Sequence, residues 1–364
     1  MRELTAVGIP DAEVIGRAPG ESGWPVWHVR HRGREYALRV LPEAVAVREA
    51  MIHRVAAAGG VPVPRVCAEA PGLLLVEWCP GVPLLEVMAA RSDALGRAFG
   101  EMQASIHALA APPGLRAMGP VAGPRLLHGD YHPLNVLTDG ERITAVLDWT
   151  NAAAGDPRTD VARTLSILRL EGRVPGRFPL ELRRVLAPFE RAWLAGYGGD
   201  LPDAIFRAWA GAFMADDMAA KRPPDHIARV RRWAGADAVN VVSEAFAAMT
   251  RGDLATVRRL VAPDLEWTYL DPSFESPEPQ VCHGREELEA GLRRMAAHGL
   301  HPQLEEVAGR GDRVLVVEHT PGLDARRARQ AGDRNFYVAT VREGRITALR
   351  ACRSRAEAAA LVNQ

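Results

Sequence analysis

Lysine is almost absent from this chain: Lys221 is the only one, and arginine supplies every other basic side chain. Cysteine is also scarce, and the spacing of the four residues does not match a zinc site. We expect the thiols to be reduced, as in a cytoplasmic protein. Together with frequent alanine and glycine, the preference for arginine is typical of a bacterial genome rich in G and C.

The chain also lacks an excess of charge of either sign, since 45 basic residues balance 45 acidic ones. This balance gives no support for binding to nucleic acid or to a membrane surface. No stretch has the length and apolarity of a membrane span, and the first residues contain no apolar run typical of a signal peptide. The sequence therefore predicts a cytoplasmic globular protein, and its 364 residues suggest two or three domains.

Polar residues are concentrated between residues 127 and 149, where short apolar runs flank a polar loop. Asp130 and Asn135 lie five positions apart on this loop, and Asp148 directly follows the next apolar run. Carboxylate and amide oxygens are ligands that Mg²⁺ prefers, usually together with substrate phosphates. We therefore expect Asn135 and Asp148 to hold Mg²⁺, which leaves Asp130 as the base that accepts a proton from an incoming hydroxyl.

The spacing His128-x-Asp130-x-x-x-x-Asn135 is that of a kinase catalytic loop, and Asp148 takes the place of the Asp in the kinase Asp-Phe-Gly motif. The longer strings HGDYHPLNVL and VLDWTNAAAGDPRTDVA closely resemble the aminoglycoside phosphotransferase and choline kinase family. The resemblance implies a bilobal protein-kinase-like fold over residues 1–234. It also implies phosphorylation of a small hydroxylated molecule by ATP or GTP, between which the sequence does not distinguish.

Residues 1–80 contain mostly strands and form the expected N-lobe of this kinase. The segments 26–30 and 36–40 flank a short turn and predict a hairpin. In the glycine-rich turn before them, the backbone of Gly20, Ser22 and Gly23 could lie over nucleotide phosphates. An ordinary hairpin turn explains the same residues equally well.

Arg39 stands on the strand where such kinases carry a phosphate-binding lysine, and Glu49 stands on the next helix, at about 44–58. The resemblance implies that Arg39, steadied by Glu49, holds the phosphates. Arginine departs from the family pattern but still binds phosphate, and the alternative is a surface arginine on an edge strand. The buried strand at 73–78, which includes Glu77, corresponds to the hinge between the lobes, where backbone groups would meet the nucleotide base.

The expected C-lobe, residues 81–234, is mostly helical. His107 lies on the apolar side of a helix and is predicted to be a hydrogen-bonded core residue. Asp156 and Asp160 are predicted to anchor the loop after Asp148. The following helices, predicted at 161–170, 180–197, 202–219 and 225–233, would shape the acceptor site. Their segment carries more basic than acidic residues, which is unfavourable for a polycationic aminoglycoside.

The pattern changes near residues 234–236, and residues 237–364 form a further expected domain. Helices precede four alternating runs, at 304–308, 313–319, 335–341 and 346–352, which predicts an α+β cone of helices on a curved antiparallel sheet. The opening AFAAMTRGDLATVRRLVAPDLEW and the ending FYVATVREGRITALRACRSRAEA resemble the SnoaL-like polyketide cyclases. The whole chain is thus expected to be of the α+β class.

The SnoaL-like resemblance implies a fold more than a function, because its members include enzymes and plain dimerisation modules. Candidate pocket residues are Trp267, Tyr269, Asp271, His283, His319 and Arg350. His319 or Asp271 would be the catalytic acid–base group, although a strand-end histidine at the surface explains His319 equally well. The domain would then act on the kinase substrate by dehydration, isomerisation or cyclisation. The alternative is that it forms a homodimer.

The sequence leaves the acceptor open among antibiotics, biosynthetic intermediates and ordinary metabolites. A rival hypothesis from another class is a degenerate kinase that only binds or scaffolds. The intact Asp130, Asn135 and Asp148 argue against that hypothesis, and Arg39 is the feature in its favour.

Overall fold

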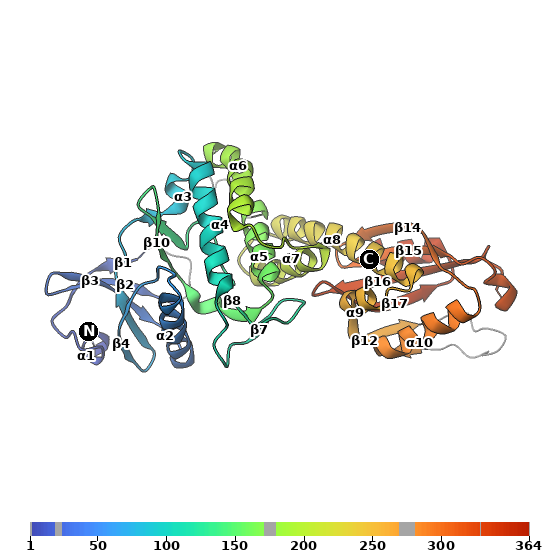
Figure 1. Ribbon diagram of the computed structural model, residues 1–364, viewed down its shortest axis with the longest axis horizontal. Helices are drawn as coiled ribbons and strands as arrows, with labels where there is room; N and C mark the ends of the chain where they lie inside the picture. The colour runs from blue at the N-terminus through green and yellow to red at the C-terminus, as the bar shows by residue number, and fades with distance from the viewer. Residues whose placement is uncertain (1, 19–23, 171–179, 269–280, 328, 364) are drawn as a thin grey trace. The chain divides into compact units, whose positions relative to one another are not determined.

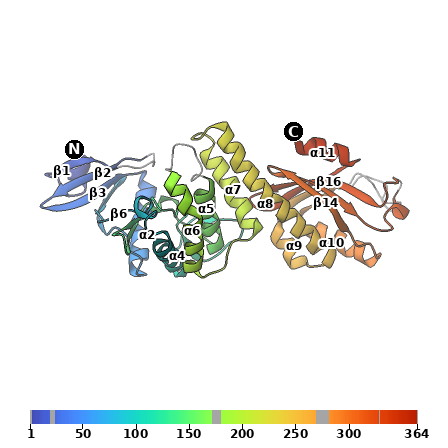
Figure 2. The same cartoon turned by 90° about the horizontal axis from the view of Figure 1, so that it is seen from above.

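The computed structural model describes residues 2–18, 24–170, 180–268, 281–327 and 329–363. The chain divides into two compact units (Figure 1, and from above in Figure 2). The first unit consists of Met1–Met118 and Ala122–Leu201, and the second of Gly119–Val121 and Pro202–Gln364. No described helix is long and apolar enough to cross a membrane.

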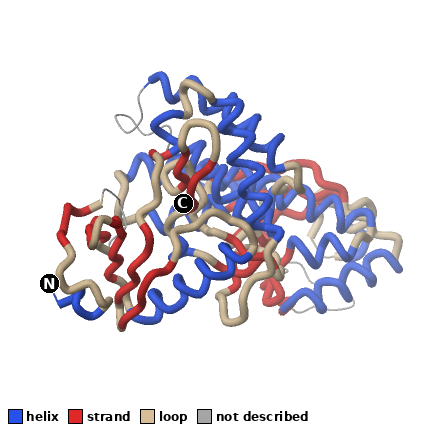
Figure 3. Tube along the Cα trace, turned by 60° about the vertical axis from the view of Figure 1, so that its left-hand side comes forward, coloured by secondary structure: helices blue, strands red, loops and turns tan. Residues whose placement is uncertain are grey.

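The N-lobe of the first unit is an antiparallel sheet in the order β1-β2-β3-β5-β4. Strands near the N-terminus are drawn red in Figure 3. Its elements are α1 (Arg2–Ala6), β1 (Glu13–Arg17), β2 (Val26–His31), β3 (Arg34–Val40), α2 (Glu43–Ala58), β4 (Val66–Ala70) and β5 (Leu73–Glu77). The predicted hairpin is β2–β3. Its turn places Arg32 and Gly33 at φ of 49° and 75°, the left-handed pair that suits the twist of a two-residue hairpin loop.

Strand alternation gives this sheet two apolar faces. Leu38 and Leu75 point to the face covered by α1, where they pack with Leu4. Leu74 and Val76 point the other way and pack with Ala50 of α2. One side of α2 therefore packs against the sheet, and Glu49 of this helix is fully buried.

The C-lobe of the first unit is built around α4 and α6, with short strands that carry the polar loop. Its elements are β6 (Val82–Pro83), α3 (Leu84–Val87), α4 (Ser92–Ala108), β7 (Ala117–Met118), β8 (Arg125–Leu127), β9 (Val136–Thr138), β10 (Ile143–Val146), η1 (Trp149–Asn151), β11 (Ala153–Gly155), α5 (Pro157–Leu170) and α6 (Leu180–Tyr197). Gly100 lets α4 and α6 pack closely, because a Cβ there would collide with the backbone at Trp193 and Tyr197. Phe99, Tyr131 and Trp193 fill the core between them.

The second unit is a six-stranded sheet in the order β13-β12-β17-β16-β15-β14, with helices on it (Figure 2). Its elements are α7 (Ala204–Met218), α8 (Pro224–Arg251), α9 (Leu254–Leu260), β12 (Val261–Thr268), β13 (Val281–His283), α10 (Gly284–Ala297), β14 (Gln303–Arg310), β15 (Arg313–His319), η3 (Asp324–Arg326), β16 (Arg334–Arg342), β17 (Arg345–Cys352) and α11 (Arg355–Asn363). The four predicted alternating runs are confirmed as β14 to β17. The sheet is antiparallel except where β12 pairs with β17 in parallel.

The largest difference from the sequence prediction concerns α8. The sequence predicts a helix at 225–233 and a change of pattern near residues 234–236, but α8 runs without a break from Pro224 to Arg251. Alanine is the best helix former and a single glycine is tolerated, so the small residues at 234–236 do not end the helix. The long segments of the two compact units meet between Leu201 and Pro202.

Candidate active site

A buried aspartate fixes the loop that joins β8 to β9. The backbone N–H groups of His128 and Gly129 donate hydrogen bonds to Asp160, at 3.0 Å to Oδ2 and 2.8 Å to Oδ1. Gly129 has φ of 79°, and a Cβ there would collide with the carbonyl of Asn151. Glycine at position 129 therefore lets this loop turn back against the η1 segment.

His107 completes this anchor. Its Nε2 lies 3.1 Å from Asp160 Oδ2 and its Nδ1 lies 3.0 Å from Tyr197 Oη. Burial alone would raise the pKa of Asp160, but the hydrogen bond and charge of His107 outweigh it, so the pKa is lowered and the carboxylate stays ionised. His107 is thus confirmed as the hydrogen-bonded core histidine that the sequence predicted. Asp160 is an anchor, but of the loop between β8 and β9 rather than of the loop after Asp148.

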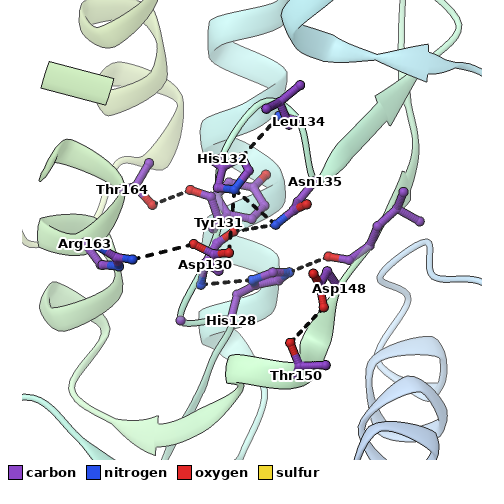
Figure 4. Close-up of polar contacts among 12 residues, drawn as sticks. His128, Asp130, Tyr131, His132, Leu134, Asn135, Asp148, Thr150, Arg163 and Thr164 are labelled. Carbon is purple, nitrogen blue, oxygen red and sulfur yellow. Dashed lines mark hydrogen bonds and ion pairs between the residues drawn. The ribbon is translucent and has the colours of Figure 1, made fainter. Parts of the chain in front are cut away.

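Asp130 projects from this loop toward two basic side chains (Figure 4). Its Oδ2 lies 3.6 Å from His132 Nε2, and its Oδ1 lies 3.9 Å from Arg163 Nη2 of α5. Burial by itself raises the pKa of Asp130, yet His132 and the charges of Arg163 and His128 lower it well below the usual range. The carboxylate is therefore ionised at neutral pH and can accept a hydrogen bond from a hydroxyl group.

The amide of Asn135 is oriented by the same loop. Its Nδ2 donates a hydrogen bond of 3.0 Å to the carbonyl of Asp130, so Oδ1 is the atom left for another ligand. Its backbone carbonyl accepts a hydrogen bond of 2.8 Å from the N–H of Leu147. This backbone contact brings the segment that carries Asp148 next to the loop.

Asp148 occupies a backbone conformation that L-residues rarely adopt, with φ of 58° and ψ of 71°. A left-handed conformation costs about 1–2 kcal/mol for a residue with a Cβ. The surroundings maintain it: the carbonyl of Leu147 lies 2.9 Å from His128 Nε2, and the Trp149 side chain is fully buried. Strain of this kind is often found at functional sites.

Arg39 connects Asp148 to α2. Its Nη2 donates a 3.0 Å hydrogen bond to Asp148 Oδ1, and its Nη1 pairs with Glu49. Burial raises the pKa of Asp148, but the charge and hydrogen bond of Arg39 and the hydroxyl of Thr150 lower it overall. The predicted contact between Arg39 and Glu49 is therefore present. Arg39 is nearly buried, unlike the surface arginine of the alternative hypothesis.

The oxygen atoms of this site suit Mg²⁺. Asn135 offers an amide oxygen whose orientation is set, and Asp148 offers an ionised carboxylate held in a strained conformation. No group of three His, Cys, Asp or Glu side chains in the described residues could hold a metal ion alone. Mg²⁺ usually keeps several waters and takes one or two carboxylates together with substrate phosphates.

Three side chains at this site were not singled out in the sequence. Arg163 and His132 face Asp130, and Thr150 donates a 2.8 Å hydrogen bond to Asp148 Oδ1. His132 and Thr150 lie within the matching motif, which was the available signal. Arg163 lies 33 positions after Asp130 on a helix, and only the packing of α5 brings it to the loop.

Of the other residues predicted to bind the nucleotide, the structure describes Glu77 but not the glycine-rich turn. Glu77 ends β5 as expected for the hinge strand, is exposed, and lies 3.4 Å from Arg65 Nε. Next to it, the Trp78 ring stacks on His28 with centroids 3.7 Å apart, a contact that the sequence did not suggest. Gly20, Ser22 and Gly23 lie outside the described residues, so their role stays a prediction.

The structure separates the candidates of the second unit. Trp267 is buried and faces Tyr337 edge-on at 6.1 Å, whereas His283 and Arg350 are exposed. His319 is partly exposed, with Nδ1 4.0 Å from Glu305 Oε1. Tyr269 and Asp271 lie outside the described residues. The acid–base roles of His319 and Asp271 stay predictions.

Two parts of the chain match models of known protein families. Residues 17–123 and 114–209 match the model of the phosphotransferase enzyme family, and together they span more than half of the chain. The chain belongs to the phosphotransferase enzyme family. Residues 242–349 of this phosphotransferase match the model of the SnoaL-like domain. The expected kinase-like N-terminal part and SnoaL-like α+β domain are both confirmed.

Individual relatives of the phosphotransferase match less of it. The hygromycin-B 4-O-kinase of Escherichia coli is 54% identical over 37 residues, which are 10% of this chain and 11% of that kinase. The chain therefore matches only a small part of the length of this curated relative.

Two solved structures resemble the first part of the chain. Macrolide 2'-phosphotransferase MphH from Brachybacterium faecium has a TM-score of 0.41 and 22% identity, over 60% of this chain and 91% of that chain. A thermostable mutant of aminoglycoside phosphotransferase APH(4)-Ia, with ADP and hygromycin B, has a TM-score of 0.45 and 17% identity, over 62% of this chain and 92% of that chain. Similarity at this level does not indicate the substrate of the present phosphotransferase.

Proposed function

We propose that this phosphotransferase transfers the γ-phosphoryl group of ATP or GTP to a hydroxyl group of a small molecule, with Mg²⁺ as cofactor. One observation carries the proposal: Asp130, Asn135 and Asp148 converge on one loop and the strand beside it, and Arg39 joins Asp148 to Glu49. Phosphoryl transfer depends mainly on positioning and charge stabilisation, and this arrangement supplies both.

Each residue has a distinct role in the proposed reaction. The ionised Asp130 accepts a hydrogen bond from the acceptor hydroxyl and orients its oxygen toward the γ-phosphorus. It takes the hydroxyl proton as the new P–O bond forms, while the bond from the γ-phosphorus to the bridging oxygen breaks and the nucleoside diphosphate leaves. Asn135 and Asp148 would hold Mg²⁺, which when bound neutralises charge on the phosphates. Arg39 places its positive charge beside Asp148, where the phosphates would lie, and Glu49 holds the guanidinium in position.

The rival hypothesis is a kinase-like protein that binds ligands without catalysis. The buried Arg39–Glu49 pair and the strained Asp148 support catalysis, because a site without that role has no need to maintain an unfavourable backbone conformation. Inactivation of an antibiotic is one form of the proposed reaction, and biosynthesis or metabolism are others. We further propose that the SnoaL-like domain either acts on the phosphorylated product or forms a homodimer.

A direct test measures nucleoside diphosphate formation from ATP and from GTP, with and without Mg²⁺, across a panel of hydroxylated compounds. The panel should contain aminoglycosides, macrolides, choline and homoserine. Acceptor-dependent turnover that needs Mg²⁺ and disappears in Asp130→Asn is the expected result. Nucleotide binding without turnover for any acceptor, or turnover unchanged in that variant, would contradict the proposal.

A further inference from the structure

Arg48 of α2 and Arg116, the residue before β7, are two basic side chains that the proposed reaction does not use. Arg48 Nη2 donates a hydrogen bond of 3.2 Å to the carbonyl of Thr150, and Arg116 Nη2 donates one of 3.3 Å to the carbonyl of Asn151. These carbonyl groups belong to consecutive residues of η1. Two segments that lie far apart in the sequence therefore bring their guanidinium groups to the same short turn of chain.

The two guanidinium groups are close enough for their charges to repel each other. Partial burial lowers the pKa of Arg116, and the positive charge of Arg48 lowers it further. Neither group forms an ion pair with a carboxylate among the residues that the structure describes. The backbone carbonyl oxygens that they contact carry only partial charges. The repulsion between the two cations is therefore not neutralised within the described part of the chain.

The backbone around both residues is held in place. Arg48 lies inside α2, next to the fully buried Glu49. The carbonyl of Arg116 accepts a hydrogen bond of 2.9 Å from the N–H of Ala154, and β7 pairs in parallel with β11. Since both residues are anchored through their backbone and through η1, the pair is a preformed arrangement.

The pair can still bind a ligand, because most of its N–H groups are not used within the chain. A guanidinium has five N–H donors in a planar fork, and each of these groups gives one hydrogen bond to η1. Arg116 is exposed and Arg48 is half-buried, so an ion from the solvent can reach them. An anion with several acceptor oxygens would neutralise the charges and accept the remaining hydrogen bonds.

The charge of the pair favours phosphate over carboxylate. A phosphate group carries a charge of about −1.5 to −2 at neutral pH and three acceptor oxygens, and it pairs with guanidinium through parallel N–H···O bonds. Two guanidinium groups therefore match one phosphate group in charge and in donors. A carboxylate has a single negative charge and would leave one of the two positive charges uncompensated.

Thr150 places this pair beside the residues of the candidate phosphotransfer site. Its carbonyl accepts a hydrogen bond from Arg48, and its hydroxyl donates one of 2.8 Å to Asp148 Oδ1 (Figure 4). The carbonyl of Asn151 lies against Gly129, where an added Cβ would come within 2.4 Å of it. An anion held by the pair would therefore lie beside the segment that connects Asp148 with the loop of Asp130.

We propose that Arg48 and Arg116 form a second anion site, beside η1, which takes a phosphate group, either as the free ion or as part of a small phosphate ester. Each guanidinium keeps its hydrogen bond to η1 and donates its other N–H groups to the phosphate oxygens. This site is independent of the phosphotransfer proposal, because neither arginine belongs to the residues assigned to that reaction.

The first test measures, residue by residue, whether phosphate covers the pair in the full chain. 4-Hydroxyphenylglyoxal modifies accessible arginines and blocks tryptic cleavage after them, so peptide mass spectrometry gives the extent of modification at each position. At constant ionic strength, inorganic phosphate should slow the modification of Arg48 and Arg116, and acetate should slow it less. Arg125 is the matched control, because it is exposed and its guanidinium also donates to a backbone carbonyl, that of Ala108 at 2.9 Å. Its modification should not change.

The second test measures affinity by isothermal titration calorimetry with inorganic phosphate and with glycerol 3-phosphate. Arg48→Gln and Arg116→Gln should each weaken binding at least about tenfold, because each removes charge-assisted hydrogen bonds. The lysine variants should keep part of the affinity, since they keep the charge. Arg125→Gln should match wild type. The probe that binds more tightly identifies the ligand as the ester or as the free ion.

Circular dichroism checks that every variant is folded, and the protection experiment on wild type decides the matter if a glutamine variant does not fold. The proposal is overturned if phosphate and glycerol 3-phosphate both leave the modification of Arg48 and Arg116 unchanged, or if acetate protects them equally well. It is also overturned if the folded glutamine variants bind both phosphate probes as tightly as wild type.

Discussion

Arg39 Nη2 lies 3.0 Å from Asp148 Oδ1, and Nη1 of the same guanidinium pairs with the buried Glu49. One planar group thus joins the helix of the N-lobe to the segment that follows β10. The ammonium of a lysine is a point charge and would not reproduce the fork geometry of the guanidinium. Arginine at this position therefore keeps the charge that phosphates need and adds a geometric link between two carboxylates.

This link makes Arg39 substitutions informative. Arg39→Lys keeps the charge and should remain active with reduced turnover, whereas Arg39→Met removes the guanidinium that pairs with the buried Glu49. Removing one member of a buried pair costs about 3–5 kcal/mol, so Arg39→Met should be both inactive and less stable. Steady-state kinetics and urea unfolding measure the two effects. A folded Arg39→Lys without activity would mean that the role requires the guanidinium itself.

Asp130→Asn should lower turnover by at least about 10²–10⁴-fold, because the amide cannot take the acceptor proton. Nucleotide affinity should change little, since Asp130 contacts His132 and Arg163 rather than Arg39 or Glu49. Single-turnover kinetics with isothermal titration of nucleotide distinguishes the two quantities. Turnover equal to wild type would remove the assignment of Asp130 as the base.

Asp148 gives a prediction that separates chemistry from backbone strain. Both Asp148→Ala and Asp148→Gly should lose Mg²⁺-dependent nucleotide affinity, because the carboxylate is missing. The glycine variant should be more stable than the alanine variant by about 1 kcal/mol, since glycine adopts φ near 58° without strain. Calorimetry and urea unfolding test the two parts. Equal stabilities would mean that the left-handed backbone relaxes in the alanine variant.

Asp160 should make stability depend on pH. Its pKa is lowered in the folded protein, so its contribution is present above the unfolded pKa of about 4 and is lost as pH falls through the folded pKa. Asp160→Asn should cost about 3 kcal/mol at pH 7. The difference from wild type should shrink in acid.

Urea unfolding at pH 7 and pH 3 measures this difference, with the exposed Asp93→Asn as the control. A gap between wild type and Asp160→Asn that is the same at both pH values would show that the charge of Asp160 is not what holds the loop.

The candidate phosphotransfer site could largely be predicted because it is local in the sequence. Asp130 and Asn135 share one loop, and the backbone contact between Asn135 and Leu147 brings in the next segment. Strands β14 to β17 of the second unit were also predictable, because period-two alternation is strong where one face of a sheet is buried. The continuity of α8 was not, because short runs of small residues are compatible with both a linker and a helix.

The sequence by itself determined which groups the protein would bring to the proposed phosphoryl transfer, since Asp130, Asn135 and Asp148 belong to one short stretch with the spacing of a kinase catalytic loop. Only the tertiary structure decided which distant side chains join them, as when α5 carries Arg163 to Asp130. The tertiary structure also decided which of the adjacent residues Glu318 and His319 is buried: Glu318 is buried, and His319 is partly exposed. A shift of one residue in strand register exchanges the two faces of a sheet, and register is set by packing between strands rather than by the strand alone.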